Sequence, residues 1–353
     1  MNDAQEPIGY QCPAMVTSTS DCVTLAHGEG GFMMRRLIRD RIRSKLPPLV
    51  SDLGDAVDVG EIEGSIAITT DSYVVSPLFF PGGDIGSMSV YGTVNDLAVA
   101  GAEPLWLTLS LIMEEGLPLA VLDRVIESVA KAAILCNVKI VAGDTKVVPR
   151  GAVDGMFINT SGVGRLPRNA PPGASHIQRG DLLIVSGPIG RHGISVLAAR
   201  ENLGFTPEPR SDSASVQHAT FALQTALGGD LRSMRDATRG GISAVMHEWA
   251  EASGLTMKLD EASIPTTADV RGVCELLGLD PLYVANEGTF VAAIAACSVE
   301  RAMDVLQLIP QTASAAVIGE VIESTISPVV IERLLGRLLA VDEPAGAPLP
   351  RIC

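Results

Sequence analysis

The stretch TTDSYVVSPLFFPGGDIG, residues 69–86, decides the fold class of this chain. The apolar run Ser65–Thr70 predicts a strand that ends at Asp71, and the glycines of Pro81-Gly82-Gly83 predict a turn. Asp84 then stands where a helix over Ile85–Ala100 would begin. A strand, a turn and a helix in this order are typical of a mixed α/β fold.

The same alternation continues on both sides of Pro167, Pro171 and Pro172, which predict a linker. In the helix expected at Leu119–Cys136, apolar residues recur with the helical period. The other expected strands are Leu105–Ile112, Val138–Ala142, Met156–Thr160, Leu182–Ser186 and Phe290–Ala295, and the other expected helices are Val196–Glu201, Val216–Leu227, Ile242–Ala252 and Ala302–Leu308.

The length of 353 residues and these elements predict two α/β domains with a short extension at each end. We expect a leader at 1–25, an N-terminal domain at 26–168, a C-terminal α/β domain at 169–341 and a tail at 342–353. The tail, DEPAGAPLPRIC, contains three prolines, so we expect a flexible, partly polyproline arm. At its full length it could span roughly 35 Å.

The bulk composition excludes several classes of protein. The net charge is −15 and no cluster of Lys and Arg forms a basic face, which argues against a nucleic-acid partner. No apolar run approaches the roughly 20 residues needed to cross a membrane, and the polar N-terminus is unlike a signal peptide. Six scattered cysteines argue against a disulfide framework, so we expect a cytoplasmic protein.

Five aspartates stand at the ends of the elements expected in the first domain: Asp55, Asp71, Asp84, Asp96 and Asp144. Carboxylates at the rim of a sheet are the hard oxygen ligands that the Mg²⁺ of a Mg²⁺–triphosphate complex prefers. For any single aspartate, capping of a turn or helix is an equally good explanation. Five in one domain, flanked by glycines such as Gly82 and Gly83, favour a site for Mg²⁺ and a nucleotide.

The second domain contributes two further candidates. Glu287, in the turn Asn286-Glu287-Gly288 before an apolar strand, is a candidate base, because partial burial would raise its pKa. A solvated turn residue is the commoner alternative. Arg239 stands at the start of a helix, where it would suit an anion, although the adjoining glycines also fit a simple packing turn.

Cys353 ends the proline-rich tail and has three possible interpretations. A prenylation site requires the cysteine four residues from the end, or paired cysteines, and this tail has neither. An exposed thiol without a role is the simplest alternative. The third interpretation is a mobile carrier thiol that is activated only inside a site.

The whole pattern resembles one known family. The segments TTDSYVVSPLFFPGGDIG, GTVNDLAVAGAEPLWL, EEG, AGDTKVV, DATRGGI, NEG and LPRIC occur in this order. From about Ala26 to Cys353 they closely resemble the HypE family of hydrogenase maturation proteins, the carbamoyl dehydratases. The resemblance implies an aminoimidazole ribonucleotide synthetase-like fold in two domains, the first of which forms a homodimer through a β-barrel.

The resemblance also implies a reaction on Cys353. A carbamoyltransferase, HypF, would place a carbamoyl group on this thiol. ATP would then phosphorylate the carbamoyl oxygen, and loss of phosphate would leave a thiocyanate. The cyanide would pass to iron on a HypC–HypD scaffold for a [NiFe]-hydrogenase.

By motif match, the resemblance implies that Cys353, Lys146 and Glu287 are catalytic, with Glu287 as the base. It implies an ATP and Mg²⁺ site from the residues Asp55, Asp71, Gly82, Gly83, Asp84, Asn95, Asp96, Asp144 and Arg239, with Asp55, Asp71, Asp96 and Asp144 as the metal ligands. The alternatives are a selenophosphate or purine-pathway synthetase of the same superfamily, or a non-catalytic docking module in metallocentre assembly.

Overall fold

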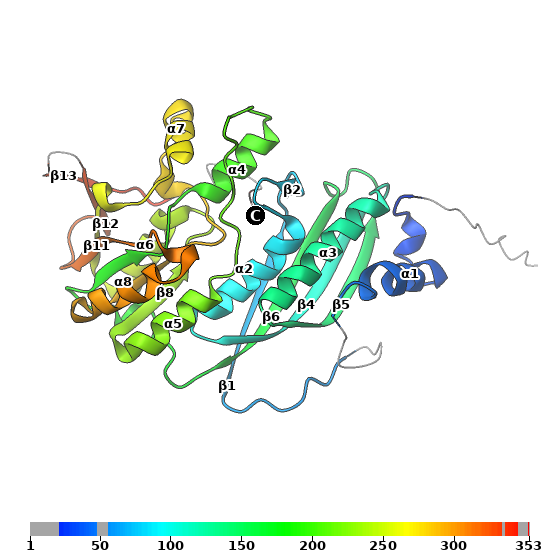
Figure 1. Ribbon diagram of the computed structural model, residues 1–353, viewed down its shortest axis with the longest axis horizontal. Helices are drawn as coiled ribbons and strands as arrows, with labels where there is room; N and C mark the ends of the chain where they lie inside the picture. The colour runs from blue at the N-terminus through cyan, green and yellow to red at the C-terminus, as the bar shows by residue number, and fades with distance from the viewer. Residues whose placement is uncertain (1–20, 48–55, 334–335, 345–351, 353) are drawn as a thin grey trace, which may run out of the picture.

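The computed structural model describes residues 21–47, 56–333, 336–344 and 352. Two α/β halves lie side by side along the long axis of the molecule (Figure 1). The first half ends with β6 (Met156–Leu166), and the second begins with β7 (Leu182–Val185). No helix within the described ranges is long and apolar enough to span a membrane.

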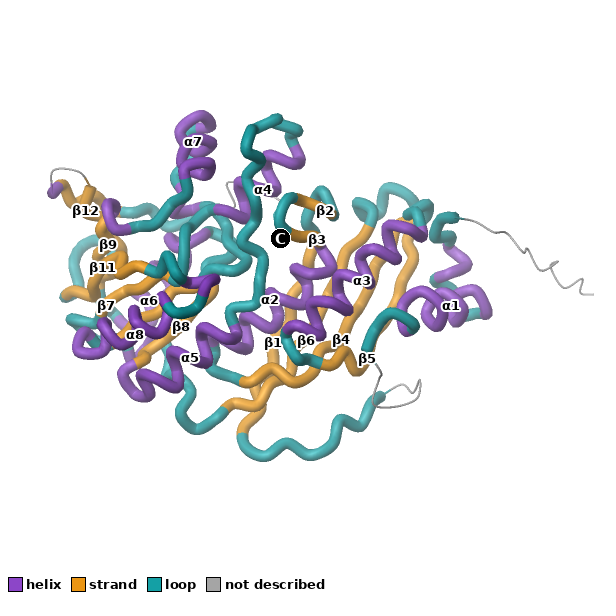
Figure 2. Tube along the Cα trace, in the orientation of Figure 1, coloured by secondary structure: helices purple, strands orange, loops and turns teal. Residues whose placement is uncertain are grey.

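The first half contains a four-stranded sheet with the order β1-β6-β4-β5. β1 (Ser65–Tyr73) and β4 (Glu103–Glu114) run antiparallel to β6, whereas β5 (Lys139–Val148) runs parallel to β4. The helices α2 (Ile85–Val99) and α3 (Leu119–Leu135) cover one face of this sheet (Figure 2). They bury the apolar face predicted for the second helix: Leu122, Val125, Ile126 and Val129.

In the part of the chain that the structure describes, no helix covers the opposite face of this sheet (Figure 2). On β1, Ile66 is 54% exposed and Ile68 is 74% exposed, while the alternate residues point towards α2. β1 and β5 are the two edge strands. This face therefore presents apolar side chains and unpaired strand edges together.

The second half contains a seven-stranded sheet with the order β13-β12-β9-β11-β7-β10-β8. α6 (Gly241–Ser253) packs on one face, and α5 (Gln217–Leu227) and α8 (Val299–Gln307) pack on the other. Because both faces are covered, every residue of β10 is buried. The remaining strands of this sheet are β8 (Leu231–Asp236), β9 (Thr256–Asp260), β10 (Phe290–Ile294), β11 (Ala316–Ile322), β12 (Val329–Arg333) and β13 (Arg337–Ala340).

Two helices differ from the sequence-based expectation. The helix expected from Val196 begins five residues earlier, as α4 (Arg191–Arg200), and α7 (Ala268–Leu277) was not expected. Gly190 adopts a φ of +79° immediately before α4, a left-handed conformation that glycine adopts without steric cost. The first turn of α4 buries the polar residue His192, so it lacks the apolar periodicity that marks a helix in the sequence.

The shorter elements surround these two sheets. β2 (Phe79–Phe80) and β3 (Gly83–Asp84) form a small hairpin before α2, and α4 lies beside it.

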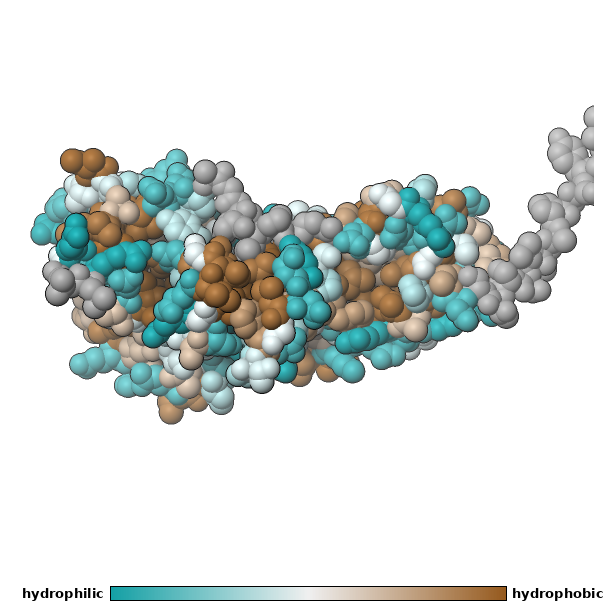
Figure 3. Space-filling model, turned by 90° about the horizontal axis from the view of Figure 1, so that it is seen from above, coloured by the Kyte–Doolittle hydropathy of each residue, from teal (hydrophilic) through white to brown (hydrophobic). Residues whose placement is uncertain are grey.

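On the face that carries α4 and α7, hydrophobic side chains gather in a patch near the middle of the molecule (Figure 3). The 3₁₀ turns are η1 (Leu25–His27), η3 (Ala174–His176), η4 (Gly228–Asp230), η5 (Glu261–Ser263), η6 (Pro281–Tyr283), η7 (Ala296–Ser298) and η8 (Pro310–Thr312).

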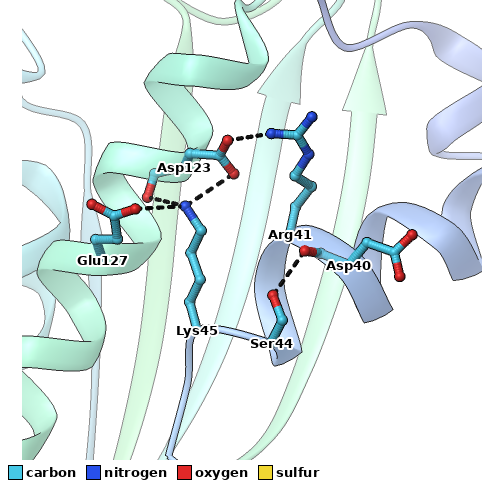
Figure 4. Close-up of polar contacts among 6 residues, drawn as sticks. All are labelled: Asp40, Arg41, Ser44, Lys45, Asp123 and Glu127. Atoms are coloured by element: carbon cyan, nitrogen blue, oxygen red, sulfur yellow. Dashed lines mark hydrogen bonds and ion pairs between the residues drawn. The ribbon is translucent and has the colours of Figure 1, made fainter. Parts of the chain in front are cut away.

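An ion-pair network attaches the N-terminal helical segment to α3 (Figure 4). This segment consists of α1 (Phe32–Leu37) and the π-helical turn η2 (Ile38–Arg43). Lys45 Nζ lies 2.8 Å from Glu127 Oε1 and 3.1 Å from Asp123 Oδ1, and Arg41 pairs with the same aspartate. Charges from two elements far apart in the sequence therefore fix this segment against the first domain.

Candidate active site

An acidic cluster lies where the two halves of the molecule meet. Asp71 of β1 and Asp96 of α2 come from the first half, and Asp236 of β8 and Glu287 come from the second. Together with Arg239 they line a small cavity of about 40 Å³. Three residues predicted from their motifs to act at a nucleotide site, and the predicted base, are thus brought together.

Burial and mutual repulsion change the acidity of this cluster. Burial, and then the charges of Asp236 and Asp71, raise the pKa of Asp96 to about 7. Burial raises the pKa of Asp236 to about 6, with further contributions from Asp71 and Glu248. Carboxyl groups with pKa values near neutrality can both take up and release protons under ordinary conditions.

Glu287 is the most strongly perturbed member of the cluster. Its side chain is 4% exposed, and burial raises its pKa well above the usual value. The neighbouring charges of Asp236, Asp212 and Asp71 act in the same direction, while Arg239 opposes them. The alternative of a solvated turn residue is therefore wrong, because this glutamate is enclosed by the fold.

The backbone around Glu287 is held by two polar side chains, the half-buried Asp212 and the buried Asn286. Asp212 accepts hydrogen bonds from the amides of Glu287 and Gly288, both at 3.1 Å, and from the hydroxyl of Thr289 at 2.8 Å. Asn286 accepts a hydrogen bond from the Gly190 amide at 2.7 Å and donates one to the Ala237 carbonyl at 2.7 Å. The turn is thus fixed to both the loop before α5 and the start of α4.

Asn95, a predicted nucleotide-binding residue, is engaged with the backbone of the second half. It is 2% exposed and donates to the carbonyls of Ala214 at 3.0 Å and Glu287 at 3.3 Å. The side-chain oxygen Oδ1 of Asn95 accepts a hydrogen bond from the amide of Val216 at 2.8 Å. These three bonds join α2 to the turn that carries Glu287, which is a positioning role.

Asp84 and the two glycines before it lie beside the start of α2. Asp84 accepts a hydrogen bond from the amide of Ser87 at 3.0 Å and is the N-cap of this helix. Gly82 has a φ of +95°, and a Cβ there would lie 2.7 Å from the carbonyl oxygen of Ser211. A Cβ on Gly83 would lie 2.8 Å from the ring of Phe80. Glycine is required here because the chain passes closely against residues 211–213.

Asp144 and Lys146 lie apart from the acidic cluster within one chain. They form an ion pair at 3.4 Å, and their side chains are 55% and 61% exposed. They stand on the outermost strand, β5, separated from β1 by two other strands of the sheet. Of the other predicted residues, Asp55 and Cys353 lie outside the described residues.

The donors fit a magnesium ion that is shared with a nucleotide. Within the described ranges, no three His, Cys, Asp or Glu side chains are arranged to hold a metal ion by themselves. Mg²⁺ usually takes one or two carboxylates and completes its shell with phosphate oxygens and water. Asp71 and Asp96 match this requirement, since the proximity of further carboxylates would make a cation favourable there.

Comparison with known proteins identifies the family. Residues 54–166 match the N-terminal domain of AIR synthase related proteins, and residues 178–331 match the corresponding C-terminal domain. The carbamoyl dehydratase HypE of Rhodobacter capsulatus is 43% identical over 334 residues, which are 94% of this chain and 98% of that protein. This chain belongs to the HypE family.

Solved structures of HypE proteins share the fold. A HypE crystal structure in complex with ATP has a TM-score of 0.88 and 41% identity, covering 94% of this chain and 99% of that one. HypE in a HypE–HypF complex has a TM-score of 0.77 and 43% identity, covering 79% of this chain and 90% of that one. The aminoimidazole ribonucleotide synthetase-like fold inferred from the resemblance is thereby confirmed.

Sequence reasoning missed two residues of this HypE family site. Asp236 belongs to the segment Asp236–Gly241, in which the sequence analysis predicted a role only for Arg239 and a turn for the glycines. Asp212 stands in a polar loop without any motif signal, and only the tertiary structure places it against Glu287. The only signal for Asp236 was its position beside Arg239 and two glycines, because the strand β8 that ends at Asp236 was not predicted, and no local pattern marks Asp212.

Proposed function

We propose that this chain is an ATP-dependent carbamoyl dehydratase that converts an S-carbamoyl group on its own Cys353 into an S-thiocyanate. Membership of the HypE family supports this activity, and the names of its relatives specify it. The observation that carries the proposal is the buried Glu287, whose raised pKa suits a group that accepts a proton in an acidic, enclosed cavity. The thiocyanate would supply the cyanide ligands of a [NiFe]-hydrogenase iron.

The proposed reaction balances without any redox partner. The carbamoyl oxygen attacks the γ-phosphorus of ATP, and the bond to ADP breaks. Both N–H protons then leave as the C–O bond breaks, so that phosphate departs and the carbon–nitrogen triple bond forms. The products are S-thiocyanate, ADP, phosphate and one proton released to solvent.

The residues of the chain take distinct roles in this scheme. Glu287 accepts an N–H proton in its deprotonated form, after its own proton has left to solvent; burial and the neighbouring charges raise its pKa and so make this carboxylate a stronger base. Arg239 orients the anionic groups that enter the cavity. Asp71 and Asp96 would hold Mg²⁺, which when bound neutralises part of the triphosphate charge.

Lys146 and Asp144 contribute from the uncovered face of the first sheet. We propose that a second copy of the chain covers this face, so that the exposed Ile66 and Ile68 are buried and the edge strands β1 and β5 are paired in a closed barrel. The Lys146 ammonium would then stabilise the phosphoryl group in a less solvated environment.

The partners follow from the same family. We propose that HypF donates the carbamoyl group, consistent with the HypE–HypF complex among the related structures. A HypC–HypD scaffold would accept the cyanide. The dehydration and the transfer of the cyanide would take place in the cytoplasm.

Intact mass spectrometry tests the proposed function. Carbamoylated protein is mixed with Mg-ATP, and the adduct on Cys353 should lose one water in step with ATP hydrolysis. A non-hydrolysable ATP analogue should leave the adduct intact. Cys353→Ala should abolish the adduct; if it retained turnover on a diffusible substrate, a selenophosphate or purine-pathway type of synthetase would replace the proposal.

A further inference from the structure

A buried histidine of α4 forms a hydrogen bond with the backbone of Ile352, the residue before Cys353. His192 Nε2 lies 2.9 Å from the carbonyl oxygen of Ile352, and the imidazole is fully buried in the first turn of α4. The Ile352 side chain is 3% exposed and packs in the same core cluster as Phe80 and Ala285. The contact therefore combines a specific hydrogen bond with apolar burial.

The neighbours of His192 define its tautomer. A carbonyl can only accept, so Nε2 carries the proton that is donated to Ile352. Burial lowers the pKa of the ring and favours its neutral form, so Nδ1 accepts from the hydroxyl of Ser211 at 2.8 Å. The Ser211 oxygen itself accepts from the amide of Ser213 at 3.0 Å, and the ring of Phe80 packs edge-on against the imidazole.

The same loop connects this contact to Glu287. Ser211 adjoins Asp212, whose carboxylate holds the amides of Glu287 and Gly288. The first turn of α4 provides a second connection, because the amide of Gly193 donates to the carbonyl of Ala285 at 3.0 Å. His192 and Glu287 are thus fixed relative to each other by two short hydrogen-bonded routes.

We propose that His192 is a positioning residue that holds the carbonyl of Ile352, so that the adjoining Cys353 is presented to the Glu287 site in a fixed register. The Ser211–Asp212 segment sets the geometry of both contacts. This inference rests on the proposed function, in which Cys353 carries the reacting group. It adds a receptor for the chain segment itself, separate from the groups that act on ATP or the carbamoyl unit.

The test compares His192→Leu, which removes the donor, with His192→Gln, which restores an N–H donor at a similar reach. His247→Leu is the matched control: this buried histidine also contacts a backbone carbonyl near the end of the chain, that of Val341 at 3.1 Å. Alkylation of Cys353 by iodoacetamide is followed by peptide mass spectrometry, with the exposed Cys297 as an internal standard.

In His192→Leu, we expect the Cys353-to-Cys297 alkylation ratio to rise about tenfold, the equivalent of one lost buried hydrogen bond. Single-turnover dehydration of the carbamoylated protein should slow by a similar factor, with the dissociation constant for ATP unchanged. His192→Gln should recover most of both effects. Ser211→Ala should move both readouts in the same direction by a smaller factor, and it serves if the leucine variant fails to fold.

Three outcomes would overturn the inference: an unchanged alkylation ratio in both variants, a changed ratio with normal dehydration, or an equal effect of His247→Leu. A wild-type protein that loses no water would instead overturn the proposed function. In that case the alkylation ratio alone would still decide whether His192 holds Ile352.

Discussion

The acidic cluster and the Asp144–Lys146 pair show how differently the fold can place predicted acidic site residues: the first is buried and the second is exposed. The sequence motifs predicted both Asp96 of α2 and Asp144 of β5 to act at the same nucleotide site. Asp96 and Asp236 lie between the two halves, where burial raises their pKa values to about 7 and about 6. Asp144 lies on the outermost strand, more than half exposed and paired with a lysine. Packing, rather than residue type, separates a perturbed carboxyl group from a solvated one.

The largest expected effect is the loss of dehydration activity when Glu287, in the buried acidic cluster, is replaced. Glu287→Gln retains the size of the side chain but removes the proton acceptor, so single-turnover dehydration should fall by about 10²–10⁴-fold. ATP binding, measured by calorimetry with Mg²⁺, should change little. The control is Glu323→Gln at an exposed ion pair with Arg179, which should leave the rate unchanged. Normal dehydration by Glu287→Gln would remove this residue as the base.

The next effect concerns the pH dependence of stability. Asp96 has a folded pKa of about 7 against an ordinary value of 3.8, so the folded state binds its proton more tightly than the unfolded state. The contribution of Asp96 to stability should therefore be fully present below about pH 4 and be lost as pH rises through 7, by up to about 4 kcal/mol for this group.

Asp96→Asn should flatten this pH profile in the absence of Mg²⁺, as measured by urea unfolding at a series of pH values. The residual slope would belong to Asp236 and Glu287, whose pKa values are also raised. Asp144→Asn, on the exposed strand, should leave the profile of the wild type intact. The two variants would contradict the comparison if they gave the same slope.

A third prediction concerns how the cluster is held in place. Asn95→Ala leaves the carbonyls of Ala214 and Glu287 and the amide of Val216 without their buried partner. Stability should fall by about 2–3 kcal/mol, because unsatisfied buried groups lose their full desolvation energy. Chemical denaturation measures this loss. Asn159→Ala is the control, since its amide contacts partly exposed groups on the other sheet face, and it should cost less.

The smallest effect is expected at the exposed pair. Lys146→Met should change the unfolding free energy by no more than about 0.5 kcal/mol, because exposed ion pairs are screened by water. Lys45→Met should cost about 1 kcal/mol, because this lysine is only 21% exposed and contacts both Asp123 and Glu127. Lys146→Met should nevertheless slow single-turnover dehydration, because the proposed role of Lys146 is chemical rather than structural. A marked loss of stability in Lys146→Met would instead mean that the pair is buried by another surface.

Local sequence determined those features that depend on neighbours in the chain. The apolar face of α3, the turn at Gly82 and Gly83 and the start of α6 all follow from spacing within a few residues, and each lies where it was expected. The motif strings also indicated Asp71, Asp96, Arg239 and Glu287, which the fold brings to one cavity. Short-range patterns carry this information because helix periodicity and turn conformation are local properties.

Tertiary structure alone decided which of these groups are buried and which charges face one another. The short strands β8 and β9 form because they pair with other strands of the seven-stranded sheet. Asp236 joins the acidic cluster, and its pKa is raised, only because the fold buries it against the first half. Asp212 and His192 acquire their partners across 75 and 160 residues of chain. Desolvation and electrostatic repulsion depend on distances in space, so no spacing along the sequence could reveal them.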